Sequence, residues 1–256
     1  MAVEMPSYIQ EKFTKLKFSE FVSLPPSVET PCTPQTPDTP LLPPPEPFQL
    51  RVIKKEESEK VLDFLRTFFF RDEPLNVDVK LLEGEKTCKE LEEYSMKALK
   101  DNVSVMAITD SGKIIGVCLN GIINKNDGKE EFIVKDPKFS KITNLLSYVD
   151  KMADVFGKYP DIDKMISVDI LSVDKSWRGQ GIAKKLMNKT RELAREQDFK
   201  LMRCDCSSHF SAKAIARLGF QCIYSLKYED YKKEGRPVFN PEHPHKEVTV
   251  YIQRIN

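Results

Sequence analysis

A glycine-rich turn that joins an apolar segment to an amphipathic one constrains this fold more than any other feature. Residues 164–174 (KMISVDILSVD) predict a buried strand, and residues 178–198 predict a helix that starts in the turn RGQG. Glycine lets the backbone approach a ligand closely. The first N–H groups of a helix have no partner within it, so they and the helix dipole favour an anion. Arg178 can add charge-assisted bonds to phosphate oxygens. This arrangement predicts a mixed α/β domain that binds a phosphate or pyrophosphate.

The residues of this turn narrow the kind of phosphate ligand. A Walker loop needs Gly-Lys-Ser/Thr after four spacer residues, and the chain has no such run. A dinucleotide fingerprint needs a third glycine three residues after Gly181, where Lys184 stands. The remaining pattern, Arg/Gln-x-x-Gly-x-Gly/Ala, is met by Arg178, Gly181 and Ala183. It resembles the acyl-CoA loop of the GNAT superfamily of N-acetyltransferases; an ordinary strand-to-helix turn is the alternative.

The remaining predicted elements alternate between strand and helix. Residues 103–123 predict a β-hairpin, because two apolar runs flank a turn at Asp110 to Gly112. The other predicted strands are residues 48–55, 199–208, 220–228 and 246–255. The other predicted helices are residues 57–70, 88–99, 140–159 and 209–219. We therefore expect one mixed α/β domain over residues 48–256.

Proline sets the first 47 residues apart. Residues 25–47 hold ten of the 17 prolines, and from Pro31 to Pro43 they recur at every third residue. Such a period suits an extended polyproline II segment. We expect residues 1–47 to be a flexible proline-rich tail, either a passive spacer or a docking segment with Thr-Pro sites.

The composition excludes several classes of protein. Lys plus Arg is 40 and Asp plus Glu is 39, which argues against a nucleic-acid binder. No apolar run approaches the roughly 20 residues of a membrane span, and the N-terminus lacks the layout of a signal peptide. Among the six cysteines only Cys204 and Cys206 are close in sequence, so no zinc pattern is complete. We expect a cytoplasmic protein with reduced thiols, no metal, no membrane and no nucleic-acid partner.

Four segments carry a closer resemblance. FFFRDEPLN (68–76), CKELEEYS (88–95), ILSVDKSWRGQGIA (170–183) and CSSHFSAKAIARLGF (206–220) look like the insect arylalkylamine N-acetyltransferases, often called dopamine N-acetyltransferases. The likeness spans roughly residues 48–256. It implies an α/β fold with a mixed, mostly antiparallel central sheet flanked by helices, in which splayed central strands form an acetyl-CoA cleft.

The resemblance also implies where acetyl-CoA, the expected co-substrate, would bind. It places the cleft between the strand that ends at Val173 and the strand over residues 199–206. A backbone N–H at a strand bulge near Val173 would stabilise the oxyanion. The residues expected to contact acetyl-CoA are Leu171, Ser172, Val173, Arg178, Gly179, Gln180, Gly181, Ile182, Ala183, Lys184 and Ser211.

The stretch FFFRDEPLN contains the candidate general base. Glu73 precedes Pro74, and pre-proline residues avoid the α region, so the helix should end at or just before Glu73. Aromatic packing, the like charge of Asp72 and a helix C-terminus would each raise the pKa of Glu73. An arylalkylamine is mostly protonated at pH 7 and needs a base, and the resemblance gives Glu73 that role. Asp72 either orients the substrate ammonium or tunes Glu73. The aromatic residues expected to line the acceptor pocket are Phe69, Phe70 and Tyr94.

Two serines are candidates for protonating the leaving thiolate. Many members of the superfamily use a tyrosine, but that position is Ile215 here. The arylalkylamine branch has been linked instead to two serines, which match Ser207 and Ser211. They lie four residues apart and could face the same way, but helix capping by Ser207 or Ser208 is equally compatible with the sequence.

These features together predict N-acetylation of a small arylalkylamine of the dopamine, serotonin, tyramine, octopamine and tryptamine class, with Glu73 as general base. The alternatives are a protein lysine N-acetyltransferase and a non-catalytic acyl-CoA-binding module. The near-neutral charge and FFFRDEPLN favour a small aromatic amine as the partner. We expect a monomer.

Overall fold

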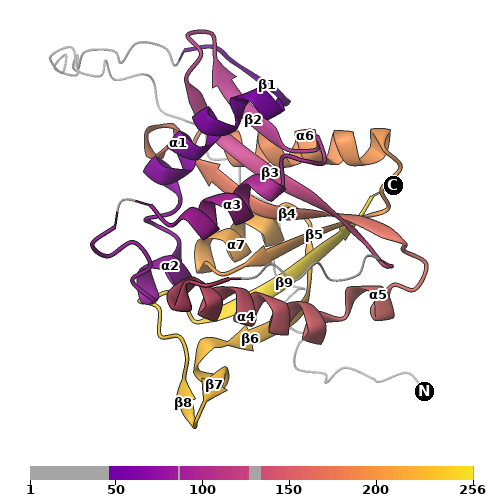
Figure 1. The fold of residues 1–256 in the computed structure, drawn as a ribbon. Coiled ribbons are helices and arrows are strands. Elements are labelled where there is room, and N and C mark those ends of the chain that lie inside the picture. The colour runs from indigo at the N-terminus through magenta and orange to yellow at the C-terminus, as the bar shows by residue number, and fades with distance from the viewer. Residues whose placement is uncertain (1–45, 86, 127–133, 256) are drawn as a thin grey trace, which may run out of the picture. The chain divides into compact units, whose positions relative to one another are not determined.

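A seven-stranded sheet runs through the described part of the chain, in the order β1-β2-β3-β4-β5-β9-β6 (Figure 1). The computed structural model describes residues 46–85, 87–126 and 134–255, so the expected tail lies outside them except for Glu46 and Pro47. The strands are β1 (Phe48–Val52), β2 (Val105–Thr109), β3 (Ile114–Asn124), β4 (Lys164–Val173), β5 (Leu201–Cys206), β6 (Gln221–Lys227) and β9 (Glu247–Arg254). Only β4 and β5 pair in parallel within this sheet. The predicted mixed, mostly antiparallel sheet is confirmed.

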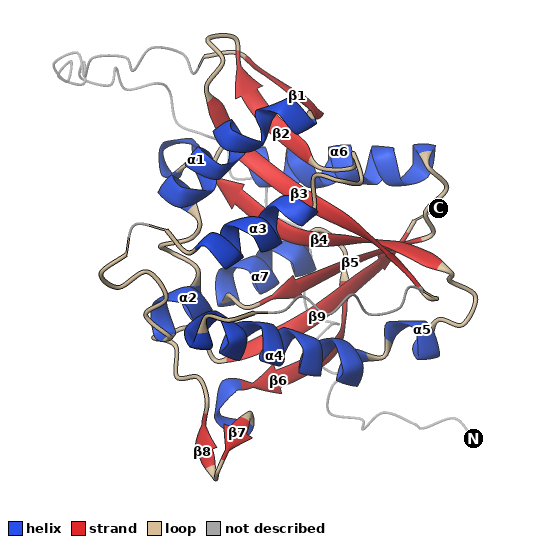
Figure 2. Cartoon of the chain, in the orientation of Figure 1, coloured by secondary structure: helices blue, strands red, loops and turns tan. Residues whose placement is uncertain are grey.

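Helices cover both faces of the sheet (Figure 2). They are α1 (Ser58–Phe68), α2 (Pro74–Asp78), α3 (Lys89–Lys97), α4 (Pro137–Ala153), α5 (Val155–Lys158), α6 (Ile182–Glu196) and α7 (His209–Arg217). α1, α3 and α4 lie on one face, and α6 and α7 lie on the other. A short hairpin of β7 (Lys232–Lys233) and β8 (Arg236–Pro237) follows β6. No helix in the described residues is long and apolar enough to cross a membrane.

The packing of α6 explains why the glycine turn leads into a helix against the sheet. α6 buries one stripe of side chains at helical spacing, which includes Ile182, Leu186 and Leu193. Gly116 on β3 lets this stripe come close, because a Cβ there would lie 3.1 Å from both Ile182 Cγ2 and Leu186 Cδ1. The second core, on the opposite face, is formed with α1, α3 and α4.

The segment around Glu73 differs from the sequence prediction. The predicted helix over residues 57–70 ends earlier, at Phe68, and a short helix, α2, begins at Pro74. Glu73 is therefore the N-cap of α2, with extended backbone angles of φ −69° and ψ 124°, and not the end of the preceding helix. The pre-proline restriction is satisfied by this N-cap conformation, and proline is favoured at the first helical position.

The two central strands separate, as predicted. β4 and β5 form only three residue pairs, which end at Val168 with Cys204. Beyond them, β4 continues along β3 to Val173 while β5 continues along β9. The bulge in β4 lies at Asp169, the extra residue between Val168 and Ile170, and not near Val173 as predicted. The predicted helix over residues 140–159 also divides, because Asp154 has a left-handed φ of 41° between α4 and α5.

Candidate active site

The glycine turn forms an open site at the N-terminus of α6. Gly179 and Gly181 have φ of 83° and 74°, a left-handed region that favours glycine, and a Cβ on either would meet nothing within 4 Å. Gly181 is the N-cap of α6 and supplies no side-chain cap, so the first N–H groups of the helix are available to a ligand. Arg178 is exposed beside them, and its Nε donates to the Val173 carbonyl at 3.3 Å. This turn fits a pyrophosphate.

The residues predicted to contact acetyl-CoA differ in how accessible their side chains are in the structure. Gln180, Lys184 and the two glycines are exposed at the turn, whereas the Ile182 side chain is buried in the core and can offer a ligand only its backbone. Leu171, Ser172 and Val173 pair with β3 along one edge and have no β5 partner along the other. That free edge fits an extended amide-containing chain, because unpaired backbone groups need hydrogen-bond partners.

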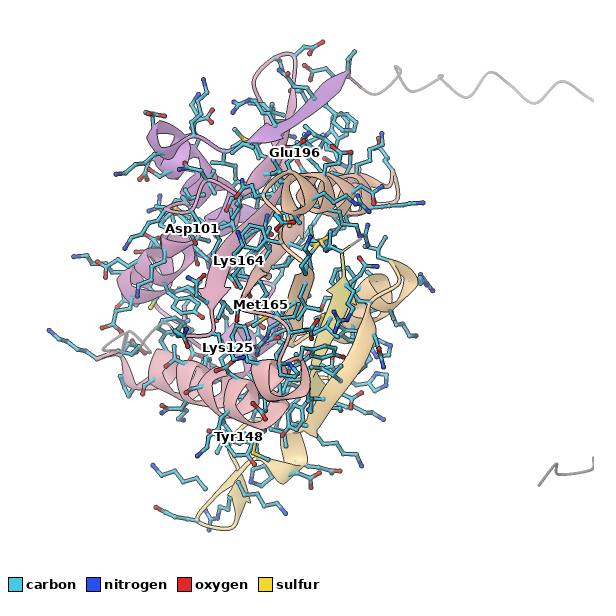
Figure 3. The ribbon with its side chains drawn as sticks, turned by 90° about the vertical axis from the view of Figure 1, so that its right-hand side faces the viewer. Asp101, Lys125, Tyr148, Lys164, Met165 and Glu196 are labelled. Atoms are coloured by element: carbon cyan, nitrogen blue, oxygen red, sulfur yellow. The ribbon has the colours of Figure 1, made fainter. Side chains whose placement is uncertain are left out.

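A cavity of about 930 Å³ lies on the α4 face of the sheet, where β4 and β5 separate. Figure 3 shows α4, marked by Tyr148, below Lys164 and Met165, which stand at the start of β4. The residues that line the cavity come from β3, β4, β5, β9, α2, α3 and α4 and from the segments just before α2, α4 and α7. Two of the aromatic residues expected in the acceptor pocket, Phe69 and Tyr94, line this cavity, together with Phe139, whose ring centroid lies 5.8 Å from that of Tyr94 in an edge-on contact. Phe70 does not line it, since this side chain is 1% exposed in the core.

Glu73 stands in the wall of this cavity with both carboxylate oxygens bonded. Oε1 accepts from the Ser207 hydroxyl at 2.7 Å, and Oε2 accepts from the Asn76 N–H at 2.7 Å. Desolvation raises the pKa of Glu73, and the hydrogen bonds from Ser207 and Asn76 oppose that rise. The expected cause at a helix C-terminus was wrong, because a helix N-terminus stabilises the anion. The charge of Asp72 is not among the causes either.

Asp72 lies outside the cavity. Its carboxylate pairs with Lys175 Nζ at 2.9 Å, and its side chain is 39% exposed. The structure therefore does not place the Asp72 carboxylate in the lining of the cavity or among the hydrogen-bond partners of Glu73.

The two predicted serines have different partners. Ser207 donates to Glu73, and its backbone carbonyl accepts from the buried Tyr228 hydroxyl at 2.8 Å. Ser211 donates to the Ser208 carbonyl at 2.8 Å and does not line the cavity. Ser208 is the N-cap of α7, where its hydroxyl accepts from the Phe210 N–H. Of the two serines considered as helix caps, Ser208 caps α7, whereas Ser207 is a hydrogen-bond partner of the candidate base Glu73.

The sequence analysis missed an acidic end of the cavity, which we define as Asp150, Asp169 and Asp205. Arg203, whose side chain is 3% exposed, donates from Nε and Nη2 to Asp205, both at 2.8 Å, and from Nη1 to Asp150. Asp169 accepts from the Ser167 hydroxyl at 2.7 Å, and burial raises its pKa to about 6. The sequence feature that could have revealed this end is an aspartate between apolar residues of a predicted strand. Asp169 stands in VDI on β4, and Asp205 stands in CDC on β5.

Known proteins resemble this chain in sequence and structure. Residues 139–233 match the family described as the acetyltransferase (GNAT) domain. Arylalkylamine N-acetyltransferase 2 from Aedes aegypti is 37% identical, with a TM-score of 0.77 over 82% of this chain and 99% of that one. The mosquito protein described as arylalkylamine N-acetyltransferase like 5b is 28% identical, with a TM-score of 0.73 over 81% of this chain and 100% of that one. A Drosophila melanogaster polyamine N-acetyltransferase that forms N-acetylagmatine shares the fold, with 24% identity and a TM-score of 0.73 over 81% of this chain and 100% of that one.

Proposed function

Since the chain belongs to the arylalkylamine N-acetyltransferases of the GNAT superfamily, we propose that it transfers the acetyl group of acetyl-CoA to the nitrogen of a small arylalkylamine. The observation that carries this proposal is the Glu73 carboxylate in the wall of an aromatic-lined cavity, at the point where the central strands separate. Acetyl-CoA supplies an acetyl group activated as a thioester. The chain's own residues bind the two substrates and remove a proton from the amine.

The separated strands and the glycine turn support binding of acetyl-CoA. The N-terminus of α6, with Gly179, Gly181 and Arg178, would hold the pyrophosphate. The free edge of Leu171–Val173 would pair with the amides of the pantetheine arm. The open space above both glycines supports this fit, because a bulky side chain there would obstruct the ligand.

Glu73 would act as the general base on the amine. An alkyl ammonium has a pKa of about 10, so a base must take its proton before or during attack. Desolvation raises the pKa of Glu73 towards neutrality, which makes this carboxylate a stronger base. The hydrogen bonds from Ser207 and the Asn76 N–H hold both oxygens in place. Ser207 would thus be a positioning residue, while Ser211 remains our candidate for donating a proton to the departing thiol.

The shape of the acceptor cavity favours a small aromatic amine over a lysine side chain in a protein. The cavity lies between the sheet and α3 and α4, and its lining includes the aromatic rings of Phe69, Tyr94 and Phe139. Aromatic side chains bind a flat ring by stacked or edge-on contacts.

Release of free thiol from acetyl-CoA tests this proposal. We expect the purified protein to release thiol with tyramine or dopamine, and not with a lysine-containing histone peptide of equal concentration. Release with the peptide alone would identify a protein acetyltransferase. Binding of acetyl-CoA by calorimetry without release of thiol with any amine would identify a non-catalytic acyl-CoA-binding module.

A further inference from the structure

The bulge in β4 places an acidic side chain in the acceptor cavity. Asp169 has no partner across the ladder, because Val168 and Ile170 pair with consecutive residues of β3. One of these β3 residues is the buried Asn120, whose Nδ2 donates to the Val103 carbonyl at 2.7 Å. A bulge redirects a side chain, and this one places Asp169 in the lining of the cavity.

Asp169 has acceptor capacity that the described residues do not use. Its Oδ1 accepts from the Ser167 hydroxyl at 2.7 Å. Its Oδ2 lies beside Gly121, where a Cβ would come within 3.1 Å of it, so the glycine leaves room for the carboxylate. No basic side chain among the described residues forms an ion pair with Asp169. Because an ionised carboxylate offers about four acceptor sites, a hydrogen-bond donor on a ligand can bind here.

The charge balance keeps Asp169 ionised at neutral pH. Burial raises its pKa to about 6, with a further contribution from the charge of Asp205. The positive charge of Arg203 is shared between Asp205 and Asp150. Near pH 7 the Asp169 carboxylate is therefore mostly an acceptor and not a donor.

The acidic end lies about one substrate length from the candidate base. Asp169 follows the last residue pair between β4 and β5, so it is level with Asp205 along the strands. Asp205 comes two residues before Ser207, whose hydroxyl contacts Glu73, and two residues of a strand span about 7 Å. In a phenylethylamine a two-carbon chain and the ring separate the nitrogen from the para position, which is a similar length.

An aromatic side chain adjoins the acidic end. Burial, followed by the charges of Asp169 and Asp205, raises the pKa of Tyr94, so the phenol of this residue lies within their field. Tyr94 and Phe139 line the same cavity. An aryl ring that packs on these side chains would carry its far substituent towards Asp169.

We propose that Asp169 accepts a hydrogen bond from a ring hydroxyl of the acceptor amine, so that the enzyme prefers hydroxylated arylalkylamines to the same amines with a bare ring. This inference rests on the proposed function. A site that hydrogen-bonds a substrate hydroxyl discriminates against the analogue that lacks it. The bare ring would cover the Asp169 carboxylate, which is exposed in the cavity, without giving it a hydrogen-bond partner.

Tyramine and phenylethylamine test the proposal, because they differ by one hydroxyl group. We expect kcat/KM of the unmodified protein to be higher for tyramine by roughly 10- to 100-fold, the size of one hydrogen bond to a charged group. Asp169→Ala should abolish this preference and leave kcat/KM for phenylethylamine within a few-fold. Asp169→Asn, which keeps the shape and removes the charge, should reduce the preference and serves if Asp169→Ala does not fold.

Asp150→Asn is the matched control, since Asp150 lines the same cavity but its charge is paired with Arg203. It should keep the preference for tyramine. Equal loss of both substrates in Asp169→Ala would show that the residue only shapes the cavity, and would overturn the proposal. An unchanged preference in Asp169→Ala, or better turnover of 1,4-diaminobutane than of tyramine by the unmodified protein, would overturn it as well. If the unmodified protein acetylates none of these amines, the proposed function itself fails.

Discussion

Replacing Glu73 with Gln removes the candidate base with little change in shape. In the structure the carboxylate accepts two hydrogen bonds, from the Ser207 hydroxyl and the Asn76 N–H, each at 2.7 Å. The amide oxygen of Gln can still accept from the Asn76 N–H, and the Ser207 hydroxyl can rotate to accept from the amide nitrogen. We therefore expect the Glu73→Gln variant to fold with the same local contacts.

The effect on catalysis should be large. A positioned general base contributes roughly 10²- to 10⁴-fold, so we expect kcat/KM with tyramine at pH 7 to fall by at least about 10²-fold. In the unmodified protein kcat/KM should decline as the pH falls through the raised pKa of Glu73. In the variant it should instead rise with pH towards the pKa of the amine, because the neutral amine is then the only reactive form. Calorimetry should show unchanged affinity for CoA.

The effect on stability should have the opposite sign. The pKa of Glu73 in the folded protein is raised above its unfolded value of about 4.3. Such a group loses stability as the pH rises through the unfolded pKa to the folded one, because ionisation is less favourable in the folded state. At pH 7 the Tm of Glu73→Gln should equal or exceed that of the unmodified protein, and the two should converge below about pH 4. Superimposable pH–rate profiles, or a marked loss of Tm with activity lost in proportion, would refute the assignment of Glu73 as a base.

Three further substitutions test other parts of the structure. Gly181→Val should raise KM for acetyl-CoA at least tenfold, because a β-branched residue is strained at a φ of 74° and would obstruct the helix N-terminus; CoA titration measures the loss. Arg203→Met should destabilise the fold by about 1–3 kcal/mol, since it removes the buried partner of the half-buried Asp205 carboxylate; urea unfolding at pH 7 measures this, and no change would show that water solvates Asp205. Ser211→Ala should lower kcat by about tenfold or less if this hydroxyl protonates the thiolate; a lower Tm at full kcat would assign it to the α7 turn, where it donates to the Ser208 carbonyl.

Local patterns predicted the fold well where one segment carries its own signal. The strand, glycine turn and helix from residue 164 to 196 follow from apolar runs and two glycines separated by one residue, and the structure confirms them. The β-hairpin over residues 103–123 is also confirmed, with its turn between Thr109 and Ile114. The rule that residues before proline leave the α region was applied to Pro74 as an end of a helix. The start of a helix satisfies the same rule, because Glu73 is an extended N-cap and Pro74 occupies the first helical position, where proline is favoured.

The acidic end of the cavity is formed by contacts between segments that are far apart in the chain. A single sequence does not show which segments pair. Asp169 reaches the cavity through a bulge defined by the register of β3 against β4, more than 40 residues apart in the chain. Asp205 has its partner Arg203 two residues away in the sequence, but only the fold brings Asp150 to Arg203. The hydrogen bond between Ser207 and Glu73 likewise joins residues 134 positions apart. The sequence named Ser207 and Glu73 as candidate site residues, but it did not show the hydrogen bond between them.

The separation of β4 from β5 divides the sheet into two parts, which are joined only by three residue pairs between these strands; we call this junction the seam. α6 packs on β1, β2, β3 and β4, whereas α4 packs on β6 and β9, and α7 on β5 and β9, so each side of the seam has its own helical support. A pantetheine arm that pairs with Leu171–Val173 would act as a removable part of the sheet and add hydrogen bonds along the open edge. Any ligand that binds only the folded chain raises its stability by RT ln(1 + [L]/Kd). The free energy of unfolding of this chain would then increase with the concentration of acetyl-CoA. Amide hydrogen exchange of the residues at the two edges of the seam would slow as acetyl-CoA binds.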